Sequence, residues 1–189
     1  IALTREPRVL WLGVAGVALA YFYHAPPLRL AYRGLGELAV AVCYGPLIAL
    51  GTFLVQHGRC DAVLAATSCA LGLLVAAFLV ANEFPDFRAD RAGDKRNLVV
   101  RLGRPRAAWL FALIALAAYA LTLAVAWRSG AAWPLGGLLG APASAWAARR
   151  LVAFPEETAR VVPAQAASLM AFLLYALGSG SLLLGLRTA

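Results

Sequence analysis

Long stretches without a charged residue are the feature that most constrains what this chain can fold into. Each of five such stretches meets or approaches the roughly 17–25 residues that cross a bilayer as a helix. They cover residues 38–56, 62–82, 107–127, 131–148 and 161–186. A sixth, shorter run covers residues 9–23 and is extended by its flanks. We therefore predict an all-α membrane protein with six transmembrane helices.

Composition supports a membrane protein and argues against the usual soluble classes. Only 14% of residues are charged and the mean hydropathy is +0.77, whereas soluble domains carry roughly 25% charged residues. The net charge of +8 does not indicate nucleic-acid binding, because the basic residues border the spans. The three cysteines and two histidines show no disulfide or metal-ligand spacing. We expect residues 1–189 to form a single transmembrane helical domain.

The distribution of basic residues predicts how the helices are oriented. The connections after the first, third and fifth predicted helices hold 12 of the 17 basic residues, and the remaining segments hold 5. Basic residues accumulate on the cytoplasmic side of membrane proteins. We therefore expect the protein to lie in the cytoplasmic (inner) membrane, with these three connections facing the cytoplasm and both termini on the other side.

The most polar stretch, NEFPDFRADRAGDKRNLVVRLG at residues 82–103, follows the third predicted helix. Asn82, Asp86 and Asp90 are spaced four residues apart, so they share one face if the helix continues. We call these three residues the acidic ladder. Pro85 argues for a kink or local unwinding there. Neighbouring carboxylates suit Mg²⁺, which prefers oxygen ligands and often binds substrate phosphates as well.

Basic residues alternate with the acids of this stretch, namely Arg88, Arg91, Lys95 and Arg96. Cations beside a carboxylate–metal site suit a polyphosphate substrate. The alternative is an ordinary solvated loop whose charges only set topology, and the pattern by itself leaves both open.

A second stretch, YHAPPLRLAYRGLGE at residues 23–37, falls in a connection predicted to lie on the same side of the membrane. Two prolines end the first predicted helix, and Gly34 and Gly36 allow a tight path. Arg29 and Arg33 are expected at the same membrane face as the acidic ladder, although this too has the alternative of a topology-setting loop.

Two glycines in the fifth predicted span, Gly136 and Gly140, are four residues apart. Small residues at this spacing let two helices approach closely. We expect a packing role for them.

Together, the ladder with its continuation AGDKRNLVVRLG and the run YRGLGE resemble the UbiA superfamily of intramembrane aromatic prenyltransferases. The resemblance extends from about residue 21 to residue 106 and is nearest to the branch that prenylates 1,4-dihydroxy-2-naphthoate in menaquinone synthesis. It implies a bundle of nine helices with two Asp-rich motifs, of which this chain resembles the last six helices and the second motif. The chain begins at Ile1 and holds no counterpart of the first motif, so we expect it to be incomplete at the N-terminus and inactive alone. Asp94 departs from the family pattern as an extra acid before Lys95.

The resemblance also implies roles for individual residues. It implies transfer of a polyprenyl group from polyprenyl diphosphate to an aromatic acceptor, within the lipid bilayer and with Mg²⁺ as cofactor. The resemblance implies that Asn82, Asp86 and Asp90 ligate the metal. It also implies that Asp86, Asp90 and Lys95 are catalytic. Substrate contacts fall to Tyr23, Arg29, Tyr32, Arg33, Arg88 and Arg91.

Two other classes remain possible from sequence. In the first alternative the chain is a non-catalytic remnant of the family. In the second it is a lipid-binding or transport protein. Transporters place ionisable residues near the midplane of their spans, whereas the acids here gather at one interface, which favours a site for an anionic headgroup such as a diphosphate.

Overall fold

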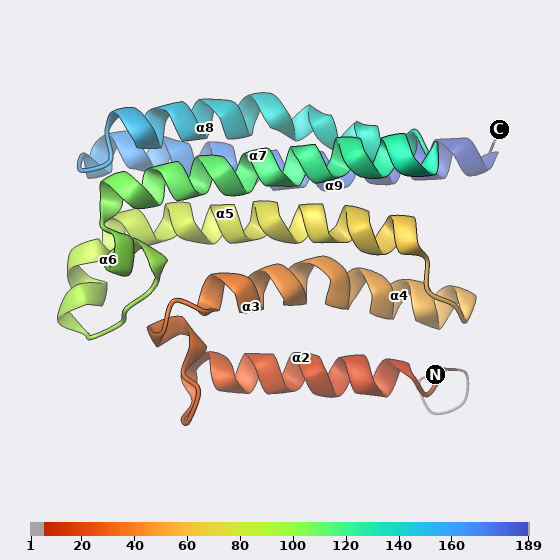
Figure 1. Cartoon of the computed structure of the whole chain (residues 1–189), viewed down its shortest axis with the longest axis horizontal. Helices are drawn as coiled ribbons and strands as arrows, with labels where there is room; N and C mark the ends of the chain where they lie inside the picture. Colours follow the sequence, from red (N-terminus) through yellow and green to blue (C-terminus); the bar gives the residue numbers. More distant parts are fainter. Residues whose placement is uncertain (1–5, 189) are drawn as a thin grey trace.

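The computed structural model describes residues 6–188, and the side chains of residues 6–185. Within that range the chain is helical, and long segments run side by side and reverse direction at each end (Figure 1). The elements are α2 (Val9–His24), the 3₁₀ turn η1 (Leu30–Tyr32), α3 (Gly36–Val42), the π-helical turn η2 (Cys43–Leu47), α4 (Ile48–His57), α5 (Ala62–Ala92), α6 (Leu98–Leu102), α7 (Arg104–Ser129), the 3₁₀ segment η3 (Trp133–Gly140), α8 (Ala141–Ala153) and α9 (Thr158–Thr188).

Four helical segments of the described chain are long and apolar enough to cross a membrane. They are Gly36–His57, which joins α3, η2 and α4, then Ala62–Ala92, Arg104–Ser129 and Thr158–Gly185. The all-helical prediction is therefore confirmed, but the predicted six spans are not. Helix α2 has 16 residues, which at 1.5 Å per residue is about 24 Å, shorter than the roughly 30 Å hydrocarbon core.

The remaining predicted span, residues 131–148, is not one α-helix. Trp133–Gly140 forms a 3₁₀ segment, and α8 follows with 13 residues. Pro134 and three glycines explain the difference, because both residue types are poor α-helix formers. A 3₁₀ segment rises about 2 Å per residue, so η3 and α8 together still extend about 35 Å.

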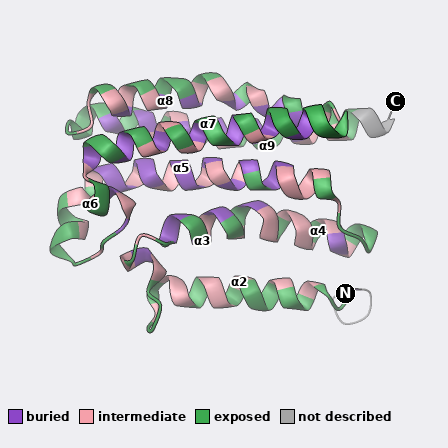
Figure 2. Ribbon diagram, in the orientation of Figure 1, coloured by how far each residue is buried: buried purple, intermediate pink, exposed green. Residues whose placement is uncertain are grey.

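The core lies between α5, α7, α8 and α9, which pack against one another. Val80, Phe84, Phe111, Leu151 and Val161 are all at most 1% exposed there. Buried residues are accordingly concentrated on these helices, whereas α2 contains none and packs mainly on α3, α4 and the short turns beside them (Figure 2).

The predicted packing role of the two glycines is confirmed. A Cβ atom on Gly140 would overlap the carbonyl oxygen of Ala171, and one on Gly136 would overlap that of Gly178. Helix α9 therefore approaches the backbone of η3 so closely that only glycine fits at these two positions.

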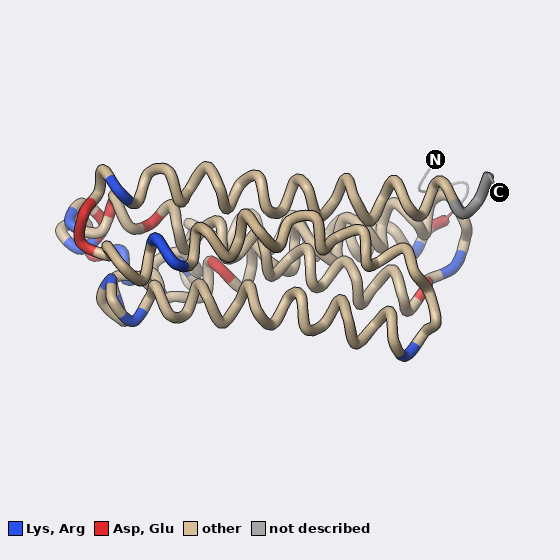
Figure 3. Tube along the Cα trace, turned by 90° about the horizontal axis from the view of Figure 1, so that it is seen from above, with Lys and Arg blue, Asp and Glu red and all other residues tan. Residues whose placement is uncertain are grey.

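Charged residues gather at the two ends of the bundle (Figure 3). One end holds the loop at residues 25–35, the last turns of α5, the loop at 93–97, α6 and the loop at 154–157. We call it the motif end. The connections that carry the twelve basic residues all lie there, so the predicted grouping of these loops is confirmed, while the side of the membrane they face stays a prediction.

Candidate functional site

The acidic ladder lies on one continuous helix. Helix α5 runs from Ala62 to Ala92 and includes Pro85. Of the predicted kink or local unwinding at this proline, the unwinding is therefore wrong, and the kink stays a prediction. Proline lacks the N–H that would bond the carbonyl four residues earlier, here that of Ala81. Gln165 of α9 donates a hydrogen bond to this carbonyl oxygen at 3.4 Å, which replaces the missing partner and lets the helix continue.

Asp90, the last residue of the ladder, is held by two side chains from the following loop. Lys95 Nζ lies 3.2 and 3.1 Å from its two carboxylate oxygens, and Asn97 Nδ2 donates to Oδ2 at 2.7 Å. Asn97 is fully buried and also caps α6, since its Oδ1 accepts from the Val100 N–H at 2.9 Å. The loop between Asp90 and α6 is therefore closed onto the ladder.

The other two ladder residues are free. Asp86 is exposed and makes no hydrogen bond or ion pair with residues 6–188, and the half-buried Asn82 likewise uses none of its side-chain atoms. Arg88 and Arg91 are exposed and form no ion pair within the same range. These polar groups remain open to a ligand.

The structure brings the two polar stretches of the sequence together. The Arg96 N–H donates to the Tyr32 carbonyl at 3.3 Å, and the Leu98 N–H donates to Glu37 Oε1 at 2.8 Å. Arg29 adopts a left-handed backbone conformation (φ 45°), and its guanidinium stacks 4.0 Å from the centre of the Tyr32 ring. The contacts join the first loop to the segment that closes on Asp90.

The basic side chains of the first loop are exposed, and the ring that Arg29 stacks on belongs to the same loop. Arg29 and Arg33 are exposed, whereas Tyr32 is half-buried. Tyr23 is half-buried at the last turn of α2. All six residues predicted to bind substrates therefore lie at the motif end, but their roles stay predictions.

Four buried polar residues of the motif end had no role in the sequence analysis. Glu37 and Glu83 are 3% and 6% exposed, Asn97 is fully buried, and Arg104 is 6% exposed. The Arg104 guanidinium donates to the Phe84 carbonyl at 3.1 Å and to Glu156 Oε2 at 3.2 Å. Asn97 carried a recognisable signal, since Asn directly before an apolar run is a common helix N-cap.

Oxygen donors of the ladder suit Mg²⁺, but they do not form a closed metal site. Asp86 has a free carboxylate, whereas both oxygens of Asp90 are already bonded to Lys95. Among the described residues no three His, Cys, Asp or Glu side chains lie close enough to hold a metal together. The residues fit an ion that takes most of its ligands from a substrate and from water, as Mg²⁺ does beside phosphates.

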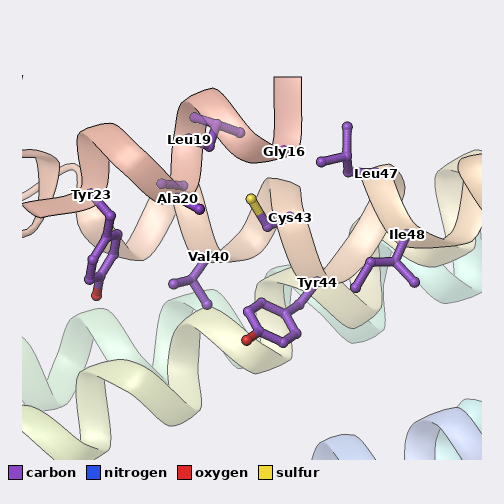
Figure 4. A pocket seen from close by; sticks show the side chains of 10 residues that line it. Gly16, Leu19, Ala20, Tyr23, Val40, Cys43, Tyr44, Leu47 and Ile48 are labelled. Atoms are coloured by element: carbon purple, nitrogen blue, oxygen red, sulfur yellow. The ribbon is translucent and has the colours of Figure 1, made fainter. Parts of the chain in front are cut away.

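A largely apolar pocket opens between α2 and the α3–η2–α4 segment. Its volume is about 590 Å³, and its lining includes Leu19, Tyr23, Val40, Tyr44 and Ile48 (Figure 4). The Tyr23 side chain projects from α2 at the edge of the pocket nearest the motif end. An apolar group can therefore lie in the pocket with one end beside the polar residues of the motif end.

These features define a helical integral membrane protein with a polar site at one end of its bundle. The model of the UbiA prenyltransferase family matches residues 1–173, and the chain belongs to this family. The family resemblance predicted from the motifs is therefore confirmed.

The chain is also similar to individual proteins whose names state an activity. The chain is 36% identical over 142 residues to a 1,4-dihydroxy-2-naphthoate octaprenyltransferase of Mycobacterium tuberculosis, covering 75% of this chain and 48% of that protein. It is 27% identical over 135 residues to a protein of the same name in Bacillus subtilis, covering 71% and 40%. It is 32% identical over 111 residues to a 2-carboxy-1,4-naphthoquinone phytyltransferase of Synechocystis, covering 59% and 36%.

The matched region thus spans about half or less of the length of these relatives. No solved structure was found to match the chain.

Proposed function

We propose that this chain forms part of an enzyme that transfers a polyprenyl group from polyprenyl diphosphate to an aromatic acceptor, 1,4-dihydroxy-2-naphthoate in the first instance. The observation that carries the proposal is that the segment after the acidic ladder, which is bonded to Asp90, also bonds Tyr32 and Glu37. Tyr23, at the same end of the bundle, lines an apolar pocket. The relatives named as naphthoate prenyltransferases support the choice of acceptor.

Binding of the diphosphate falls to the open polar groups of the motif end. Arg29, Arg33, Arg88 and Arg91 are exposed there, and guanidinium groups bind phosphate oxygens through paired hydrogen bonds. Lys95 is bonded to Asp90 in this structure, so it reaches a diphosphate only by exchanging that partner. The polyprenyl tail lies along apolar helix surfaces, where each buried CH₂ contributes about 0.8 kcal/mol.

Magnesium is proposed as the cofactor, with Asp86 as its first protein ligand and Asn82 and Asp90 on the adjacent turns. Bound Mg²⁺ neutralises the charge that develops on a diphosphate leaving group. Asp86 is oriented for this by the unbroken α5, and Lys95 and Asn97 fix the side chain of Asp90 beside it. The apolar pocket excludes water from the allylic carbon, so that the acceptor ring rather than water is alkylated.

The proposed setting is the cytoplasmic (inner) membrane, with the motif end toward the cytoplasm. The basic residues of this end support that orientation through the positive-inside rule. None of the observations favours the alternative of a transporter, because the charged residues of the described spans lie toward the ends of the helices rather than at the midplane.

The test compares two aspartates of α5 in the full-length protein. Asp86→Asn removes a charged ligand while keeping the size of the side chain. Asp61→Asn changes the N-cap of the same helix at the opposite end, where Asp61 accepts from the Leu64 N–H at 2.8 Å, and asparagine caps equally well. We expect Asp86→Asn to lower Mg²⁺-dependent prenyl transfer at least about hundredfold, since loss of a metal ligand removes several kcal/mol.

Asp61→Asn should transfer prenyl groups at the wild-type rate. Equal rates for the two variants would contradict the proposed metal site. A wild-type full-length protein without Mg²⁺-dependent transfer to any hydroxylated aromatic acceptor would contradict the proposed function.

A further inference from the structure

Pro85 weakens the helix that carries the acidic ladder at a point inside the ladder itself. It lies between Asn82 and Asp86, so it separates the first ladder residue from the other two. Its ring removes the N–H that would bond the Ala81 carbonyl and is crowded against that carbonyl. Proline is also one of the few causes of sharp helix kinks, which exceed about 20°. The hydrogen bonds of α5 alone therefore do not fix how its two halves are oriented.

Gln165 of α9 supplies the donor that α5 lacks. Its Nε2 atom donates to the Ala81 carbonyl oxygen at 3.4 Å. Ala81 is fully buried, and so is Ala164, the neighbour of Gln165 in the same core cluster. A buried carbonyl without a donor loses its hydration without compensation. The Ala81 carbonyl thus depends on a side chain from another helix.

Arg104 of α7 contacts the same turn of α5 from a different helix. Its Nε atom donates at 3.1 Å to the carbonyl of Phe84, which precedes Pro85, and its guanidinium lies 5.1 Å from the centre of the Phe87 ring. Arg104 is 6% exposed and is itself paired with Glu156 at 3.2 Å. Two helices, α7 and α9, therefore each place a side-chain donor on the backbone beside the proline.

We propose that Gln165 is a positioning residue for the proposed metal site. Its bond to Ala81 fixes the orientation of one half of α5 relative to the other. Asn82 precedes the proline, whereas Asp86 and Asp90 follow it, so their oxygen atoms keep a constant spacing only if this orientation is fixed. The inference rests on the proposed function and adds a residue from a helix that carries none of the predicted site residues.

The geometry of a helix shows why a small change at the proline matters. Asp90 is five residues beyond Pro85, about 7.5 Å along the axis at 1.5 Å per residue. A change of about 20° at the proline moves Asp90 by about 2.5 Å relative to Asn82. Functional groups need to be held within about 0.5 Å, and a misplacement of about 1 Å can lower a rate about hundredfold. One hydrogen bond at this point can therefore control the geometry of the metal site.

The first test is a double-mutant cycle in the full-length protein that does not depend on catalysis. Gln165→Met keeps the length and helix propensity of the side chain but removes the donor. Pro85→Ala gives α5 its own N–H for the Ala81 carbonyl. In lipid nanodiscs, Gln165→Met should speed hydrogen exchange in the peptide at residues 86–92 roughly three- to tenfold. In the Pro85→Ala background the same change should alter exchange by less than about twofold.

Ser168→Ala is the matched control on α9. The Ser168 hydroxyl donates to the Gln165 carbonyl of its own helix at 2.8 Å, so its loss should have the same effect with and without Pro85. Because any residue other than proline restores the N–H, Pro85→Leu provides a second background. The inference is overturned if Gln165→Met has the same effect in the presence and absence of Pro85, or if Ser168→Ala shows equal coupling.

The second test measures whether the bond between Gln165 and Ala81 serves the metal site. In the full-length enzyme, Gln165→Met should raise the Mg²⁺ concentration for half-maximal prenyl transfer at least about tenfold. Loss of folded protein would instead lower the rate equally at every Mg²⁺ concentration. Adding Pro85→Ala should restore the Mg²⁺ dependence to within about threefold of wild type. An unchanged Mg²⁺ dependence in Gln165→Met overturns the positioning role.

Failure of this inference and failure of the proposed function are distinguishable. A wild-type protein without Mg²⁺-dependent transfer refutes the proposed function, whatever the exchange cycle gives. An exchange cycle without coupling refutes the role of Gln165, whatever the enzyme transfers.

Discussion

Replacing Asn97 by alanine tests whether the loop after α5 is held onto Asp90 as the structure describes. Asn97 makes two hydrogen bonds, one that caps α6 and one to the Asp90 carboxylate at 2.7 Å. Loss of an N-cap costs about 1 kcal/mol, and loss of a hydrogen bond to a charged group costs about 1.5–3 kcal/mol. Because Asn97 is fully buried, water cannot replace either bond, and we expect the free energy of unfolding to fall by about 2.5–4 kcal/mol.

A serine at the same position separates the two contributions. Ser is as good an N-cap as Asn but is too short to reach Asp90, so Asn97→Ser should be about 1 kcal/mol more stable than Asn97→Ala. The measurement is unfolding of the purified chain by sodium dodecyl sulfate in mixed micelles, followed by circular dichroism. An Asn97→Ala variant within about 0.5 kcal/mol of wild type, which is the range of ordinary surface substitutions, would refute the described network.

Two further predictions concern the loop at residue 94 and the orientation of the bundle. Asp94 has a positive φ of 52° and forms an exposed ion pair with Arg96. Asp94→Gly should stabilise the chain by about 0.5–1 kcal/mol in the same unfolding assay, because glycine adopts the left-handed conformation without strain and the lost surface pair is weak. Asp94→Ala should not stabilise it. In intact cells, a membrane-impermeant maleimide should label the native, exposed Cys60 from outside the cytoplasmic membrane. It should fail to label Asp94→Cys in a Cys60→Ser background until the membrane is opened, and the reverse pattern would contradict the proposed orientation.

Helical spans and the acidic ladder follow from local sequence. Charge-free runs long enough to cross a bilayer predict helices wherever they occur, because unpaired backbone groups are not tolerated in hydrocarbon. The spacing of Asn82, Asp86 and Asp90 then places them on one face of α5 whatever the helix packs against. Both predictions depend on residues a few positions apart, and the structure confirms the continuous helix of the ladder and four of the six predicted spans.

Two predictions from local patterns were wrong, each for a different physical reason. Pro85 predicted a kink or local unwinding of α5. Gln165 of α9, which lies 84 residues from Ala81 in sequence, bonds the Ala81 carbonyl that the proline leaves free, and α5 does not unwind. The run at residues 131–148 predicted one α-helix, whereas close packing of Gly136 and Gly140 against α9 accompanies a 3₁₀ segment. A tertiary contact decided the outcome at Pro85, whereas at residues 131–148 the local proline and glycines already disfavour an α-helix.

The sequence by itself determined that the chain is helical, that it is apolar enough for a membrane, and that one face of one helix carries the acids. Only the tertiary structure decided which groups those acids meet. Glu37 and Glu83 lie side by side because α3 packs on α5, and Glu37 bonds the Leu98 N–H across 61 residues of sequence. Asp90 contacts Lys95 and Asn97 because the loop after α5 folds back onto it. Helix periodicity fixes the direction of a side chain within its own helix, but its partners depend on how the helices pack, which residue spacing does not encode.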